Sequence, residues 1–202
     1  MKNSRFGVLA FLGIAVLIAA GLAKFLPRNA AKEAERKALE FVGAEGQKAD
    51  TAHPRTLERK GFRLEYPSNW KIDEKDEDYD PDRMFSIESP GSAFVMIAMV
   101  PVKVDPEEHM KGQIDSFANL MGAKPSVARF ETYGRYKGKG ASLKGKVLGV
   151  PVTVKAFACF AEGATALVVQ QVPDEDIGLE KDGLDLIEKS FVLIPKNPPP
   201  VP

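Results

Sequence analysis

The chain has 202 residues, 44% of them hydrophobic, and its 28 lysines and arginines balance 28 aspartates and glutamates. A net charge of zero excludes a protein held to nucleic acid or to an anionic membrane by bulk electrostatic attraction. The one cysteine, Cys159, has no partner for an intrachain disulfide. Stability must therefore come from a hydrophobic core, and the roughly 140 residues from about Arg55 to Pro195 suffice for one domain.

The amino terminus holds an uncharged apolar run from Phe6 to Ala23, preceded by Lys2 and Arg5. As a helix this run would reach roughly 27 Å, close to the thickness of a bilayer's hydrocarbon core. We therefore predict a membrane anchor at residues 6–23, within an amino-terminal segment 1–26. The amino terminus would be cytoplasmic and the rest of the chain periplasmic or extracellular. A cleaved secretory signal, which would leave the protein secreted, is the alternative.

Two further segments flank the expected domain. Residues 27–56 read as a stalk and tether: residues 30–41 are alanine-rich with ion pairs at helical spacing, and the glycines and polar residues that follow interrupt any periodicity. Residues 196–202 form a proline-rich tail, which we expect to be disordered. Docking of this tail in an aromatic groove of a partner is the alternative.

The domain is expected at residues 57–195. Phe62, Leu64 and Tyr66 alternate with polar residues, which predicts a half-buried strand. In the run 94–100 the residues that would point to either face of a strand are apolar, so we expect that strand to be covered on both faces. Similar patterns predict strands at 70–72, 85–88, 93–104, 127–137, 140–148, 150–160, 164–172 and 190–194.

Two helices complete the expected domain. Asp105 and Pro106 are typical of a helix start, and the stripe that follows should face a sheet; its members are Met110, Ile114, Phe117 and Met121. A second helix is expected from Leu179 to Lys189, with Leu184 and Ile187 facing inward. The pattern predicts an α+β fold with a mainly antiparallel sheet flanked by helices.

One segment resembles a known family. The run Phe62-Arg63-Leu64-Glu65-Tyr66-Pro67-Ser68-Asn69-Trp70, together with Ser190-Phe191 after a helix, is similar to the PsbP-like superfamily of photosystem II extrinsic subunits and bacterial secreted or anchored proteins. The resemblance covers about Leu57 to Ile194. It implies an α/β/α sandwich and an accessory or binding role without catalysis, and it supplies no ligand residues.

No residue pattern indicates a catalytic, cofactor or metal site. His53 lies in the tether and His109 in a helix that we expect to leave it solvated, and neither has the neighbours of a zinc site. Cys159 lies in an apolar strand and is interpreted as a core residue. We therefore predict a non-enzymatic binding domain that contacts an envelope protein. An envelope structural or assembly factor is the alternative, as is a hydrolase or calcium-dependent protein with an unrecognised site.

Two charge clusters are candidates for binding. In the acidic run 73–82, Asp76, Asp78 and Asp80 have the spacing of calcium ligands, but Pro81 and Ile87 occupy positions where a calcium loop needs glycine and glutamate. We interpret this run as a solvated loop, with weak calcium binding as the alternative. Cations on neighbouring predicted strands could form one basic face that binds an acidic protein partner, a lipid headgroup or a polyanion, or they could keep a strand surface soluble; they are Arg129, Arg135, Lys137, Lys139, Lys144 and Lys146.

Overall fold

The computed structural model describes residues 47–75, 79–121, 125–147, 150–161 and 163–194. The predicted anchor at 6–23, the stalk helix at 30–41 and the tail at 196–202 lie outside the described residues, so they stay predictions. Within the described ranges, no helix is long and apolar enough to cross a membrane.

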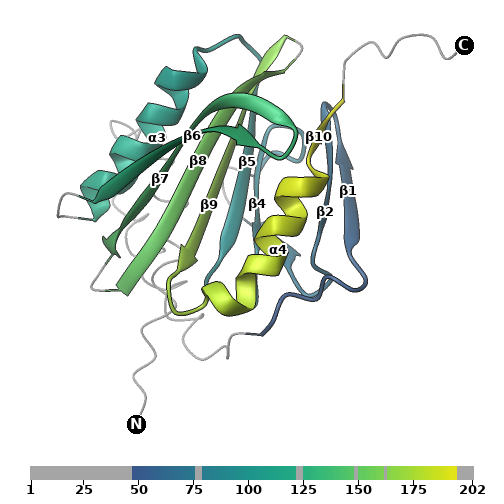
Figure 1. Cartoon of the computed structure of the whole chain (residues 1–202). Helices are drawn as coiled ribbons and strands as arrows, with labels where there is room; N and C mark the ends of the chain where they lie inside the picture. The colour runs from purple at the N-terminus through teal and green to yellow at the C-terminus, as the bar shows by residue number, and fades with distance from the viewer. Residues whose placement is uncertain (1–46, 76–78, 122–124, 148–149, 162, 195–202) are drawn as a thin grey trace, which may run out of the picture.

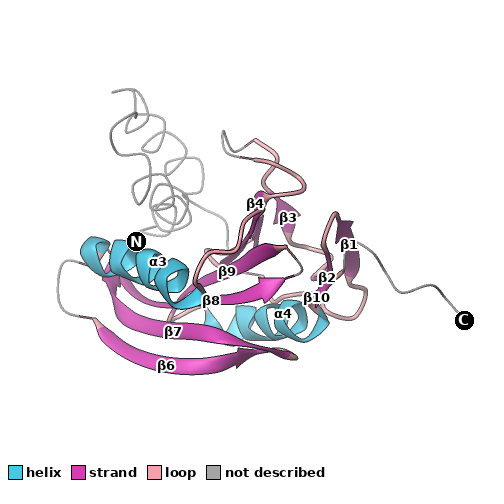
Figure 2. Cartoon of the chain, turned by 90° about the horizontal axis from the view of Figure 1, so that it is seen from above, coloured by secondary structure: helices cyan, strands magenta, loops and turns pink. Residues whose placement is uncertain are grey.

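The described residues form two antiparallel sheets and two long helices (Figure 1 and Figure 2). The small sheet has the order β1-β2-β10, with β1 (Arg55–Arg59), β2 (Phe62–Tyr66) and β10 (Val192–Leu193). The large sheet has the order β3-β4-β5-β9-β8-β7-β6, with β3 (Lys71–Ile72), β4 (Met84–Glu88), β5 (Phe94–Val100), β6 (Ser126–Tyr133), β7 (Tyr136–Val147), β8 (Val150–Ala161) and β9 (Ala164–Pro173). The helices are α3 (Pro106–Leu120) and α4 (Ile177–Ser190).

The large sheet is the middle layer. Alternate residues of β5 enter two separate hydrophobic clusters: Phe94 and Met96 lie on the face that α3 covers, whereas Val95 and Ile97 lie on the face shared with α4 and the small sheet. Successive side chains of a strand point to opposite faces, so an entirely apolar strand requires a cover on both sides. The structure thus confirms the predicted coverage of this strand and the α+β class.

Both helices pack as their sequence patterns predict. The side chain of Asp105 accepts hydrogen bonds from the backbone nitrogens of Glu107 (2.7 Å) and Glu108 (3.2 Å), which satisfies amides that a helix start leaves free. The predicted stripe of α3 is buried, as are Leu184 and Ile187 of α4. α4 runs to Ser190, so the closing strand is shorter than the expected 190–194, because the Ser190 hydroxyl donates to the Leu186 carbonyl (2.7 Å) within the helix.

Strand β1 was not predicted, because Leu57 is its one apolar residue and the other side chains are exposed or half-buried. β1 forms because it pairs along its whole length with β2. A two-residue turn joins the two strands, and in it Gly61 adopts a φ of 99°, a value that favours glycine. The residues before β1 also differ from the expected flexible tether. Ala49 is buried, and Asp50 accepts a hydrogen bond from the Ser68 hydroxyl (2.6 Å).

The segment expected to be one strand at 127–137 contains a hairpin. Gly134 has a φ of 53°, and the chain reverses there between β6 and β7. A register shift between Phe130 and Thr132 adds a bulge to β6. These features set which side chains of the hairpin share a face, and strand periodicity alone did not predict them.

Gly183 should be a sensitive position for stability. A Cβ there would lie 2.7 Å from the Trp70 ring and 2.8 Å from Pro67, whereas a Cβ at Gly112 of α3 would meet nothing within 4 Å. We expect Gly183→Ala to lower the free energy of unfolding by roughly 1–3 kcal/mol through overpacking. Gly112→Ala should raise it by about 0.5–1 kcal/mol through helix propensity. Chemical denaturation followed through Trp70 fluorescence measures both; equal effects of the two substitutions would contradict this packing.

Candidate functional site

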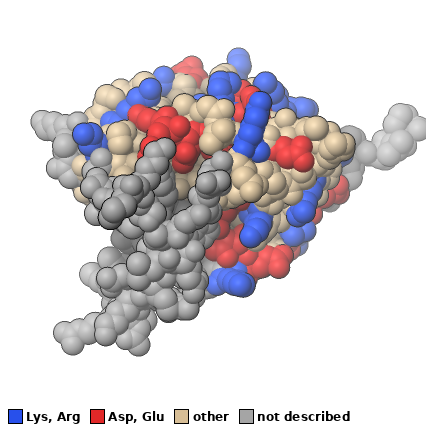
Figure 3. All heavy atoms as spheres, turned by 90° about the horizontal axis from the view of Figure 1, so that it is seen from below, with Lys and Arg blue, Asp and Glu red and all other residues tan. Residues whose placement is uncertain are grey.

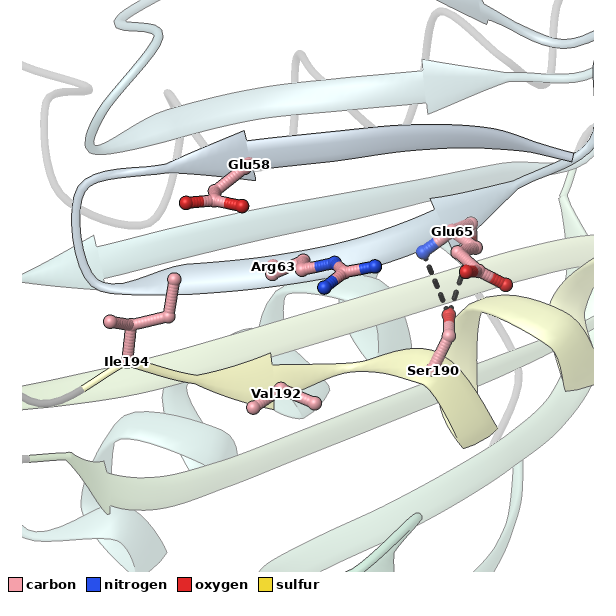
Figure 4. Close-up of a pocket in the computed structure, with 6 residues that line it drawn as sticks. All are labelled: Glu58, Arg63, Glu65, Ser190, Val192 and Ile194. Atoms are coloured by element: carbon pink, nitrogen blue, oxygen red, sulfur yellow. Dashed lines mark hydrogen bonds between the residues drawn. The ribbon is translucent and has the colours of Figure 1, made fainter. Parts of the chain in front are cut away.

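A shallow groove lies on the outer face of the small sheet, with a cavity volume of about 510 Å³. The inner face of this sheet carries Leu57, Phe62 and Leu64, which are buried in the core. Strand alternation therefore places the intervening residues outside. The groove is lined by Glu58, Arg63, Glu65, Ser190, Val192 and Ile194 (Figure 4).

The strand register places Arg63 at the centre of the groove. It pairs across the ladder with Glu58 on β1 and with Val192 on β10, so the three residues form one row across the sheet. Figure 4 shows its guanidinium extending along β2 toward Glu65. Arg63 is exposed, and among the described residues no carboxylate lies within ion-pairing distance of it. Its donors are therefore available to another molecule.

Ser190 closes one end of the groove. Its hydroxyl accepts a hydrogen bond from the Glu65 backbone nitrogen (2.8 Å) and donates to the Leu186 carbonyl (2.7 Å). This pair of hydrogen bonds extends the pairing of β2 to the residues just before β10 begins, and it joins the small sheet to the end of α4. Because both functions of the hydroxyl are structural, Ser190 is not placed as a nucleophile.

The groove combines one free guanidinium, two carboxylates and two aliphatic side chains. Guanidinium groups bind carboxylates with two parallel hydrogen bonds, and partly buried aliphatic residues add apolar contact. An open groove with these side chains suits a segment of polypeptide. In the sequence, Arg63 and Glu65 appear only as the polar positions of a predicted strand, because the groove depends on pairing with residues more than a hundred positions away.

The predicted basic residues do not form one face. Leu143 and Val147 of β7 pack with α3, so Lys144 and Lys146 point to the opposite side of the sheet. Arg129 lies on the α3 side, where it pairs with Glu107 (2.7 Å), and Lys139 pairs with Glu131 (3.6 Å). Lys137 lies two residues before Lys139 in β7 and therefore on the same face of the sheet as Lys139. Arg135 lies in the turn between β6 and β7. Figure 3 shows acidic and basic side chains interspersed on the end of the molecule that it displays.

The acidic run 73–82 is only partly described, because residues 76–78 lie outside the described ranges. Asp80 Oδ1 accepts a hydrogen bond from the Asp82 backbone nitrogen (3.0 Å). Asp80 Oδ2 lies 3.9 Å from Arg83 Nε. Within the described part of the chain, no group of three or more metal-ligating side chains could hold a metal ion. For the complete run, the solvated loop stays the prediction and weak calcium binding stays its alternative.

The other singled-out residues divide between core and surface. Cys159 is buried, and burial raises the pKa of its thiol to about 11, which confirms the interpretation of a core residue. His53 is exposed. His109 differs from the expected solvated residue: it is half-buried, and burial lowers its pKa.

Glu180 is a buried acid that the sequence did not reveal. Its side chain is 0% exposed, and among the described residues neither carboxylate oxygen forms a hydrogen bond of normal geometry, although the Ser89 hydroxyl lies beside the acid. Burial raises the pKa of Glu180 to about 7, a rise that the Ser89 hydroxyl opposes and the Asp176 carboxylate increases. A Cβ at Gly91 would lie 2.5 Å from Glu180 Oε1, so the β4–β5 hairpin packs closely over the acid.

Several solved structures resemble this fold, whereas no protein-family model and no curated protein matches the sequence. LpqN, which is involved in cell envelope biogenesis of Mycobacterium tuberculosis, is 15% identical over 74% of this chain and 100% of its own, with a TM-score of 0.47. The Ran-binding protein Mog1p of Saccharomyces cerevisiae is 8% identical over 71% of this chain and 96% of its own, with a TM-score of 0.46. The cyanobacterial PsbP of Synechocystis is 9% identical over 66% of this chain and 87% of its own, with a TM-score of 0.43.

One of these structures is a PsbP, so the chain is similar in structure to a member of the superfamily that its sequence resembles. These likenesses concern the fold, with TM-scores of 0.43 to 0.47.

The ionisation of Glu180 should make stability depend on pH. Between pH 4.5, the ordinary pKa, and about 7, the folded state retains a proton that the unfolded state has lost. The free energy of unfolding therefore falls as pH rises through this window, by about 3 kcal/mol in total from this group, and this contribution is constant above it.

Glu180→Gln should remove that contribution, so the variant gains stability relative to the wild type as pH rises. Denaturation at about pH 5 and about pH 8 measures the difference. Glu74→Gln, at an exposed position, serves as the control and should track the wild type at both values. If the free energies of unfolding of the wild type and Glu180→Gln differ by the same amount at both pH values, this account is contradicted.

Proposed function

We propose that the protein is a membrane-anchored binding domain, displayed outside the cytoplasm, whose groove on the small sheet contacts an envelope protein. The observation that carries the proposal is the exposed guanidinium of Arg63, which has no ion-pair partner among the described residues and lies between two carboxylates and two aliphatic side chains. Exposed arginines beside apolar contacts are frequent energetic centres of protein interfaces.

The apolar run 6–23 supports the anchoring part of the proposal, because its length and lack of charge suit a membrane-spanning helix. Anchoring restricts the domain to the membrane surface, so that even a weak groove interaction gains from a high local concentration of a membrane-bound partner. Anchoring and the groove contacts together would therefore suffice for binding, without a chemical reaction.

Arg63 should control partner binding. With a photo-crosslinking residue in place of Val192 in cells that produce the protein, we expect a discrete crosslinked species. Arg63→Glu should reduce its yield by roughly tenfold, because charge reversal repels a partner carboxylate. Arg83→Glu, at an exposed position outside the groove, is the matched control and should leave the yield unchanged. An equal yield from all three proteins would refute the groove as the binding site.

The location of the protein can be tested separately. We expect the intact chain in the membrane fraction, with the domain digested by a protease that is added outside the cytoplasmic membrane. Replacement of Leu12 and Val16 by Lys should release the chain from the membrane, because charged residues near the centre of a spanning helix cost about 2.5–3.5 kcal/mol each. An intact wild-type chain in the cytosolic fraction would refute the anchoring proposal.

A further inference from the structure

Strand β1 ends the small sheet, and its outer edge has no neighbouring strand in the described part of the chain. The turn at Lys60 and Gly61 joins β1 to β2 with Arg59 opposite Phe62. The residues that close a two-residue hairpin exchange both backbone hydrogen bonds, and the following pairs alternate. Leu57 and Arg59 therefore bond to β2, whereas Thr56 and Glu58 direct their backbone groups outward.

Two contacts support this assignment. The backbone nitrogen of Glu65, which lies opposite Thr56, donates to Ser190 Oγ (2.8 Å) and not to β1. The Glu58 carbonyl accepts a hydrogen bond from the Arg59 guanidinium (3.3 Å) at an exposed site. Apart from this side chain, no group among the described residues forms a hydrogen bond with the outward edge of β1. An edge of this kind can accept a further strand.

We propose that an extended segment of the partner protein adds to β1 as an antiparallel strand. This inference rests on the proposed binding function and specifies how a segment of the partner is held beside the groove. A residue placed opposite Glu58 would continue the row formed by Glu58, Arg63 and Val192 across the sheet. The added strand therefore forms a fourth strand beside the groove.

The side chains of β1 specify the chemistry of the segment. Cross-strand neighbours of opposite charge stabilise a sheet, so the residue opposite Glu58 is basic and those opposite Arg55 and Arg59 are acidic. Leu57 faces inward and takes an apolar neighbour, and Thr56 suits a hydroxyl. Read from its amino end, the antiparallel segment is acidic, basic, apolar, hydroxyl and acidic.

A second copy of the chain does not meet these requirements. Antiparallel pairing of β1 with itself over all five residues would be centred on Leu57 and would place Arg55 opposite Arg59 twice. Like charges directly opposite one another are destabilising. The edge therefore selects a different polypeptide of complementary charge.

The probe is a labelled peptide with the core Glu-Lys-Val-Thr-Glu, titrated into the 202-residue chain in detergent micelles. We expect saturable binding and the largest amide chemical shift changes at Thr56 and Glu58. Thr56→Pro should weaken binding by about tenfold or more, because proline removes the outward amide without removing a bond to β2. Thr56→Val keeps this amide and is the matched control, which should bind within about twofold of the wild type.

A charge swap provides the second arm. Glu58→Lys should weaken binding of the lysine peptide by roughly tenfold, and a peptide with glutamate in place of the lysine should recover affinity for this variant. Absence of saturable binding to the wild type would overturn the inference, as would equal binding by the proline and valine variants. If crosslinking still depends on Arg63 in that case, the groove function stands and only strand addition fails.

Discussion

The position of Phe62 is the constraint on which the groove depends. This fully buried ring lies 5.6 Å from the ring of Phe85 on β4 and 6.2 Å from that of Phe191, which follows α4. Aromatic contacts of this kind join the small sheet, the large sheet and the last helix in one core. Because β2 alternates, the inward position of Phe62 forces Arg63 to face solvent.

The carboxyl end of the described chain completes this arrangement. Ser190 contacts Glu65 across 125 positions of sequence, and β10 then pairs with β2. The aliphatic wall of the groove, Val192 and Ile194, directly follows α4 in the chain, so the packing of α4 on the core positions it. The groove is thus a product of folding, and it would be lost with the last helix.

Arg63 and Glu180 each lack an ion-pair partner among the described residues, and the two groups differ in their energetic consequences. Arg63 is exposed, so water satisfies its guanidinium at little cost until a partner replaces that water. Glu180 is buried without a hydrogen bond of normal geometry among the described residues, and its environment favours the neutral acid. The exposed group therefore suits recognition, whereas the buried group links the packing of α4 against the β4–β5 hairpin to pH.

The sequence by itself determined the elements whose burial is periodic. The alternation around Phe62 and Leu64, the stripe of α3 and the apolar run of β5 each predicted their faces, because each face is buried by continuous contacts. Tertiary structure decided the remainder. The pairing of β1, the opposite orientations of Arg129 and Lys144, and the burial of Glu180 depend on strand register and on segments distant in sequence, which local patterns do not encode.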